Sequence, residues 1–187
     1  MRAAGRVSAS GKRGHVPVPV LIALALILVA GPVAYAALPH RAPAEWHGGP
    51  TLAQIARSAG CRLTEFQDDM DTNPPVTGRF LERARVDDGS YAGRRPPSLS
   101  DTIHAMFHGR VLFQYRPGLP AKDVQALDRL TGRDTDRVLL FENQTGMPAP
   151  VAATAYLSVM TCPRVDRRVL AAFDAFRERR RAFGQSF

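Results

Sequence analysis

Two histidines four residues apart are the residues of this sequence whose spacing best suits chemistry. His104 and His108 lie in a segment whose pattern predicts a helix, and residues four apart on a helix project from one face with Cβ atoms about 6 Å apart. Two imidazoles at that spacing can hold one Zn or Cu ion. Asp101, three residues before His104, could add an oxygen ligand from the same face. The alternative is that both histidines are polar residues satisfied by hydrogen bonds at a helix–strand junction.

The two cysteines are the next candidates for a defined chemical role. Cys61 and Cys162 are the only cysteines of the chain, and in an oxidising compartment such a pair in a small domain most simply forms a disulfide. The bond would close a loop of about 100 residues and stabilise the fold by about 4 to 5 kcal/mol on the chain-entropy model. Two free thiols or a shared metal are the alternatives, although no CxxC spacing supports a soft-metal site.

Other sequence patterns that would indicate a metal, catalytic, phosphate or nucleic-acid site are weak or absent. Asp68, Asp69 and Asp71 form an acidic cluster, but nothing follows them at the spacing of a calcium loop, so a solvated turn is the favoured interpretation. The sequence contains no nucleophile elbow and no Gly-rich phosphate loop. Arginines are spread among acidic residues and are not gathered between aromatic residues, which argues against nucleic-acid binding.

The N-terminal residues predict the cellular compartment of the histidine pair and the two cysteines. Residues 1–15 are basic, and the 22 uncharged residues from Val16 to Ala37 would extend about 33 Å as a helix, enough for a hydrocarbon core of about 30 Å. Positive charge before the span places the N-terminus in the cytoplasm. We therefore expect residues 16–38 to be a single-pass transmembrane signal-anchor in the cell membrane. The basic residues before the span are Arg2, Arg6, Lys12 and Arg13.

Cleavage of this segment is the alternative to an anchor. Ala34-Tyr35-Ala36 has the small-x-small pattern of a signal-peptidase site, so the segment could also be a signal peptide. Both interpretations export the same chain: a linker at residues 39–50 and an extracytoplasmic domain at residues 51–187. The exported part keeps 21 basic and all 17 acidic residues, and so has a net charge of +4. No strongly basic domain is implied.

The pattern of residues after position 50 predicts a domain of the α/β (α+β) class, with a small sheet flanked by helices. Helices are typically marked by their caps and by apolar residues at intervals of three and four, and strands by β-branched and aromatic runs. The expected order is a helix at 51–58, an irregular excursion at 62–100, a helix at 100–108, a strand at 111–115, a helix at 120–132, a strand at 138–141, a turn at 143–150, a strand at 151–160 and a last helix that starts at Pro163.

The last helix combines an apolar stripe with a basic end. Its stripe contains Val169, Phe173, Phe176 and Phe183, which predicts a face packed on the sheet. Arginines crowd its C-terminal turn, where the helix dipole favours cations. A solvated helix end is the favoured interpretation of this run, and contact with anionic lipid is the alternative. The arginines are Arg177, Arg179, Arg180 and Arg181.

Five short motifs are ordered along about residues 57 to 163. They are Asn73-Pro74-Pro75-Val76-Thr77-Gly78, His104-Ala-Met-Phe-His108-Gly109-Arg110-Val111, Gln114-Tyr115-Arg116-Pro117-Gly118, Gly146-Met147-Pro148 and Thr161-Cys162-Pro163. Together they resemble the domain of unknown function 3105 (DUF3105) family of membrane-anchored bacterial envelope proteins. That family has no established activity to carry over.

This sequence departs from the family pattern at two positions. The resemblance implies a helix reading HxxEHG, which would place a carboxylate beside two metal ligands, and a proline motif followed by Pro-His, whose histidine would be a third ligand. Phe107 stands at the position of the Glu, and Arg79-Phe80 stands at the position of the Pro-His. Without the water-activating carboxylate, hydrolysis loses several kcal/mol of transition-state stabilisation.

The sequence therefore predicts a non-enzymatic envelope protein with no cofactor, whose domain contacts an unidentified envelope protein. The competing prediction is a Zn- or Cu-binding envelope module that uses His104 and His108, with Asp101 as an additional ligand.

Overall fold

A six-stranded mixed sheet forms the centre of the chain in a computed structural model, which describes residues 49–65, 72–82 and 86–181. The strand order is β1-β6-β5-β3-β4-β2. Strand β3 pairs in parallel with β4, which pairs in parallel with β2, whereas the β3–β5, β5–β6 and β6–β1 pairs are antiparallel. The strands are β1 (Arg62–Glu65), β2 (Gly89–Ser90), β3 (Val111–Tyr115), β4 (Val138–Glu142), β5 (Val151–Ala155) and β6 (Ser158–Cys162).

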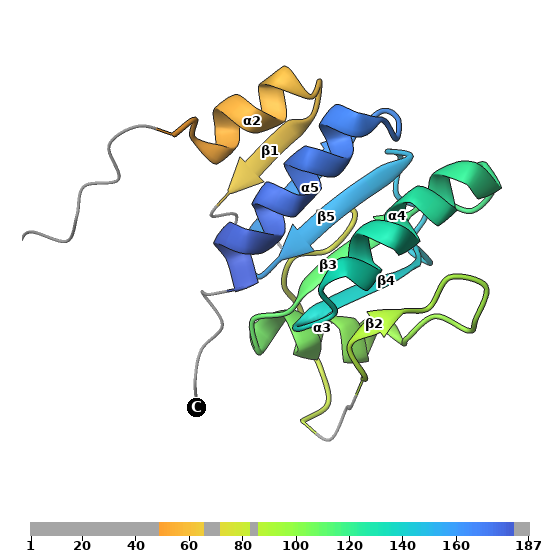
Figure 1. The fold of residues 1–187 in the computed structure, drawn as a ribbon. Helices are drawn as coiled ribbons and strands as arrows, with labels where there is room; N and C mark the ends of the chain where they lie inside the picture. The colour runs from red at the N-terminus through yellow and green to blue at the C-terminus, as the bar shows by residue number, and fades with distance from the viewer. Residues whose placement is uncertain (1–48, 66–71, 83–85, 182–187) are drawn as a thin grey trace, which may run out of the picture. The chain divides into compact units, whose positions relative to one another are not determined.

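The four helices found among the described residues cover the two faces of this sheet unequally. Helices α2 (Leu52–Ser58), α4 (Ala121–Arg133) and α5 (Arg167–Arg180) lie side by side over one face, as Figure 1 shows. Helix α3 (Leu99–Phe107) lies on the other face. We refer to these as the three-helix face and the α3 face. The expected α/β class with a disulfide is confirmed, while the sheet is larger than expected.

The three-helix face contains the larger apolar core. Alternate residues of β3, Val111 and Phe113 among them, point into it because successive strand residues face opposite sides. Phe113 stacks on Phe173 of α5 with ring centroids 5.3 Å apart, and neither side chain is exposed. Such aromatic contacts contribute strongly to a core. This face therefore supplies most of the hydrophobic stabilisation.

The α3 face has a smaller core that includes polar groups. Ile103 and Met106 of α3 pack on Leu112, Leu139 and other residues of β3 and β4. Gln114 follows on the same side of β3 and is only 3% exposed. The α3 face thus contains a buried glutamine beside its apolar residues.

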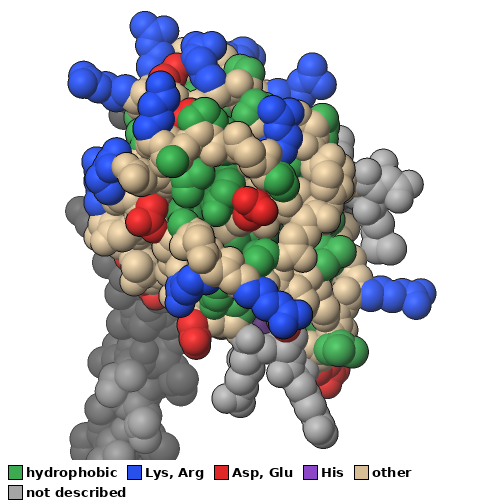
Figure 2. Space-filling view, turned by 90° about the vertical axis from the view of Figure 1, so that its right-hand side faces the viewer, with side chains coloured by type: hydrophobic (Ala, Val, Ile, Leu, Met, Phe, Trp, Pro, Cys, Tyr) green, Lys and Arg blue, Asp and Glu red, His purple; other side chains and the backbone are tan. Residues whose placement is uncertain are grey.

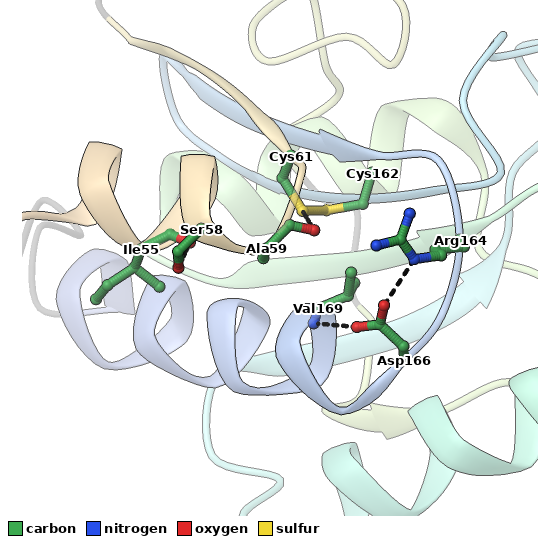
Figure 3. The surroundings of a disulfide bond; sticks show 8 residues. All are labelled: Ile55, Ser58, Ala59, Cys61, Cys162, Arg164, Asp166 and Val169. Carbon is green, nitrogen blue, oxygen red and sulfur yellow. Dashed lines mark hydrogen bonds and ion pairs between the residues drawn. A yellow bond between two sulfur atoms is a disulfide. The ribbon is translucent and has the colours of Figure 1, made fainter.

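The predicted disulfide joins Cys61 to Cys162, as Figure 3 shows. Cys61 follows α2 and Cys162 ends β6, so the bond ties the first described helix to the last strand across 101 residues of sequence. Near it, Asp166 caps α5 by accepting a hydrogen bond from the Val169 backbone N–H, at 2.9 Å. The linkage fixes one edge of the sheet beneath the helices that cover it.

Three expectations about local structure were wrong. The segment 151–160 is not one strand: β5 and β6 form a hairpin whose turn is Tyr156-Leu157, with Leu157 at φ 55°. The excursion at 62–100 contains β1 and β2, whose four and two residues are too short for a periodic pattern. The last helix begins at Arg167 after the cap residue Asp166, and not directly at Pro163.

The arginine run of α5 is not simply a solvated helix end. Arg177 is 4% exposed and donates a hydrogen bond to the Asp134 carbonyl oxygen beyond the end of α4, at 3.2 Å. Arg181 pairs with the Asp134 carboxylate, and Arg180 pairs with Glu65 at the end of β1. The pairing with Arg181 lowers the pKa of Asp134. These arginines connect α5 to two other elements.

The N-terminal predictions and the acidic cluster Asp68, Asp69 and Asp71 lie outside the described residues, and Phe183 does too. Among the residues that are described, none of the helices has the length and apolar character needed to cross a bilayer.

Candidate functional site

Helix α3 positions the histidine pair through well-defined ends. Its N-terminus is a capping box: the Ser98 hydroxyl accepts from the Asp101 backbone N–H, and the Asp101 carboxylate accepts from the Ser98 backbone N–H. The sequence placed this cap near Ser100, so the cap lies earlier than predicted. At the C-terminus, Gly109 takes φ 78° and its N–H bonds to the Met106 carbonyl oxygen at 2.8 Å, which ends the helix where the sequence predicted.

The two imidazoles converge at the C-terminal end of α3. The Nε2 atoms of His104 and His108 are 2.8 Å apart, so one ring donates the hydrogen bond that the other accepts. Partial desolvation lowers the pKa of His108, and positive charge on His104 and Arg110 lowers it further. Charge on the His108 ring is therefore disfavoured. The two Nε2 atoms can bind one metal ion once the proton between them leaves.

An aromatic ring covers the pair from a segment distant in sequence. Phe80 stacks on His104 with centroids 4.8 Å apart and an interplanar angle of 7°. Phe107 contacts Phe80 at 5.2 Å and meets Tyr156 of the β5–β6 turn edge-on at 5.7 Å. We call these five residues, His104 and His108 together with Phe80, Phe107 and Tyr156, the aromatic cluster. The two positions that depart from the family pattern, 80 and 107, are thus in direct contact.

The segment 73–80 brings Phe80 to this place through three contacts. Asn73 donates to the Thr145 carbonyl oxygen at 2.9 Å, and the Val76 carbonyl oxygen accepts from the Leu157 N–H at 3.1 Å. Gly78 takes φ 152°, and a Cβ atom there would lie 2.9 Å from Ile103 Cδ1. The glycine therefore allows the chain to approach α3 closely enough for the next residues to reach His104.

Asp101 does not complete a three-ligand site. Its Oδ2 accepts from the Ser98 hydroxyl at 2.7 Å as part of the helix cap. Across the described ranges, no group of three or more His, Cys, Asp or Glu side chains is placed to hold a metal ion. The structure brings together the two predicted histidine ligands and leaves the predicted aspartate in a structural role. Metal binding by the pair stays a prediction.

A second polar cluster on the α3 face is internally satisfied. Gln114 donates to the Thr154 hydroxyl at 2.8 Å and accepts from the Asn143 amide at 2.7 Å. The Asn143 side-chain oxygen in turn accepts from the Met147 backbone N–H at 3.2 Å. The family motifs around residues 114 and 146 are therefore joined by buried hydrogen bonds, which indicates that they stabilise the fold.

The surface of the domain mixes charges and apolar groups. Figure 2 shows one face on which Lys and Arg side chains are spread around the outside, with Asp and Glu among them and hydrophobic side chains near the middle. The view shows no large field of one sign, in keeping with the dispersed arginines of the sequence. Exclusion of nucleic acid stays a prediction.

Sequence reasoning missed Tyr156 and the role of Phe80. Tyr156 is 41% exposed and belongs to the cluster only because the hairpin turn reaches the end of α3. The departure of position 80 from the family pattern was the available signal, and its contact with position 107 could be seen only in three dimensions.

A family model described as "Protein of unknown function (DUF3105)" matches residues 67–184, which is more than half of the chain. The match extends through α5, beyond the range that the motifs indicated, and starts after Cys61. Comparisons with curated proteins and with solved structures gave no match.

Proposed function

The chain belongs to the DUF3105 family, and we propose that it is a single-pass membrane protein whose extracytoplasmic domain binds another envelope protein without catalysing a reaction. The observation that carries the non-enzymatic part is the stack of Phe80 on His104, with Phe107 beside it. Apolar rings lie where a general base and a third ligand would be required.

The disulfide supports the extracytoplasmic placement. Cys61 and Cys162 are bonded across 101 residues, and such structural disulfides persist in oxidising compartments. The basic residues before the apolar run at 16–38 support an N-terminus that stays in the cytoplasm.

The aromatic cluster supports a protein-contact role. Tyr156 is 41% exposed, and Leu81, next to Phe80, is 73% exposed. Tyr and Phe are enriched in the centres of protein interfaces, because they bury a large area at low entropic cost. The proposed contact surface comprises the aromatic cluster and Leu81.

Site-specific photocrosslinking in living cells tests the contact surface. A photoreactive phenylalanine at position 156 of the full chain is expected to give a discrete adduct that Phe107→Asp abolishes. The matched control is the same probe at Lys122, an exposed residue of α4. Equal adducts at both positions, or none at position 156, would contradict the proposal.

Thiol labelling and surface proteolysis test the placement. In intact cells, we expect both cysteines to resist labelling until a reductant is added, and externally added protease to remove the C-terminal domain. Thiols that label without reduction would show that the placement is wrong.

Turnover assays test the non-enzymatic part. The full chain is expected to leave generic ester, peptide and phosphate substrates unchanged. Turnover that is lost in His104→Ala would overturn this part of the proposal.

Metal handling is the second candidate, and the observation that favours it is the 2.8 Å separation of the two Nε2 atoms. Protein purified without a histidine tag would then contain stoichiometric Zn or Cu, and His108→Ala would remove it. Asp101→Asn is the matched control, because the carboxylate acts in the helix cap and its loss leaves both Nε2 atoms in place. Metal-free protein that also fails to bind added Zn or Cu would end this candidate.

A further inference from the structure

A pocket lies beside the aromatic cluster, at the turn between β5 and β6. Its volume is about 220 Å³, whereas an apolar cavity of about 150 Å³ can hold one benzene molecule. It is therefore large enough for a small ring or a short aliphatic chain. Its walls come from the end of β1, the end of α3, the hairpin turn and the end of α5.

Most of the wall is apolar. Met106 of α3 is 2% exposed, Ala155 of β5 is 5% exposed, and the turn residues Tyr156 and Leu157 complete that side. The apolar wall favours a ligand whose larger part is hydrocarbon.

Ser158 supplies the polar contact within this wall. The residue is 3% exposed, and its Oγ makes no hydrogen bond to any residue in the described part of the chain. A buried hydroxyl without a partner costs free energy, so an unsatisfied group in a native structure calls for a bonding partner. As both donor and acceptor, this hydroxyl can bond a hydroxyl, amide or carbonyl group of a ligand.

The charged residues of the wall neutralise each other. Glu65 is the residue opposite Ser158 in the β1–β6 register, and its carboxylate pairs with Arg180 of α5. The Arg180 side chain is only 16% exposed, and burial lowers its pKa. Because this pair has no net charge, the pocket favours an uncharged ligand over an ion.

We infer that this pocket binds a small, uncharged, mostly apolar molecule carrying one hydrogen-bonding group, which contacts the Ser158 hydroxyl. The site is separate from the histidine pair and does not depend on the proposed protein contact, although Tyr156 lies at the border of both.

Phenol and benzene are the matched probes for this inference, since they differ by one hydroxyl. The full chain in lipid nanodiscs would carry ¹³C-labelled methionine methyl groups. Met106 lines the pocket and reports binding, while Met147 and Met160, buried elsewhere at 1% and 0% exposure, are internal controls. We expect phenol to shift the Met106 signal saturably and to bind more tightly than benzene.

Ser158→Ala is expected to weaken phenol binding about three- to tenfold, the effect of losing one hydrogen bond, and to leave benzene binding unchanged. Ser58→Ala, an exposed serine of α2, is the matched control and is expected to change neither. Ala155→Leu would fill the pocket and abolish binding of both probes, with dispersed control methyl signals showing that it is folded.

Three results would overturn the inference. They are shifts of all methionine signals together, no saturation by phenol, and equal binding of phenol and benzene that Ser158→Ala does not alter.

Discussion

The two faces of the sheet differ in what they contain: one has the larger apolar core, and the other has the buried polar network and the histidine pair. The three-helix face packs apolar side chains from three helices and four strands around Phe113 and Phe173. The α3 face instead buries Gln114 in a hydrogen-bonded network and presents the histidine pair at its edge. A polar site destabilises a core unless every group is paired. The large apolar face offsets that cost, which allows the α3 face to accommodate polar residues.

Of the changes considered, removing the disulfide is expected to have the largest effect on stability. The bond joins Cys61 and Cys162 at the three-helix face. Replacing both cysteines, as Cys61→Ala with Cys162→Ala, is expected to lower the free energy of unfolding by about 4 to 5 kcal/mol on the chain-entropy model. Urea unfolding followed by circular dichroism measures it. Reductant should destabilise the wild type and leave the double variant unchanged, and equal stability of the two proteins would contradict the prediction.

A cavity in the larger core is the next strongest perturbation. Phe173→Ala is expected to cost about 3 to 5 kcal/mol, since the ring is fully buried against Phe113. Ile103→Ala on the α3 face should cost less, near the lower end of the range of about 2 to 5 kcal/mol for such truncations. Urea unfolding of the two variants provides the comparison. An equal or larger loss for Ile103→Ala would remove the distinction between the faces.

Breaking the buried polar network has a smaller expected effect. Gln114→Ala leaves the Asn143 amide and the Thr154 hydroxyl without this partner, at a cost of about 1 to 3 kcal/mol. Combining it with Thr154→Ala should restore part of the loss, because one orphaned hydroxyl is then removed. Thermal unfolding of the single and double variants tests this coupling. Additive losses would show that the network is not a unit.

The smallest expected effect is the pH dependence of the histidine pair. The pKa of His108 is lowered from its ordinary value of 6.5 in the folded protein, so the unfolded chain takes up its proton at a higher pH than the folded chain. Stability from this group is present above pH 6.5 and is lost as the pH falls below it. Urea unfolding between about pH 8 and about pH 5 should show a shallower slope in His108→Gln than in the wild type.

Carboxylates dominate the pH dependence at lower pH. Hydrogen bonds to backbone N–H groups and to Arg164 lower the pKa of Asp166 from 3.8, so its contribution is lost as the pH falls below that value. Comparing His108→Gln with the wild type isolates the histidine from this background. An identical slope in both proteins would show that His108 does not contribute to the pH dependence as predicted.

The sequence predicted much of the three-helix face because its signals are local. The apolar spacing of Val169, Phe173 and Phe176 indicated a packed helix, and a single pair of cysteines indicated the disulfide. The β5–β6 turn gave no such signal, since Tyr156-Leu157 lacks the Gly, Asn or Asp that usually marks a hairpin. The burial of Arg177 was missed for a related reason: its partner at residue 134 lies 43 residues away.

The α3 face was predicted only in part. Helical spacing was enough to place His104 and His108 together, and the observed separation of 2.8 Å agrees with that placement. The capping role of Asp101 was hidden because Ser98, not Ser100, begins the helix. The stack of Phe80 on His104 depends on a loop path that no periodicity encodes.

The path of segment 73–80 has a consequence for the order of folding. Asn73 bonds to a residue 72 positions later, and Val76 bonds to the β5–β6 turn. Contacts between residues so distant in sequence form late, because a long loop must close before they can be made. We therefore expect Phe80 to cover His104 late in folding, after the β5–β6 hairpin has formed.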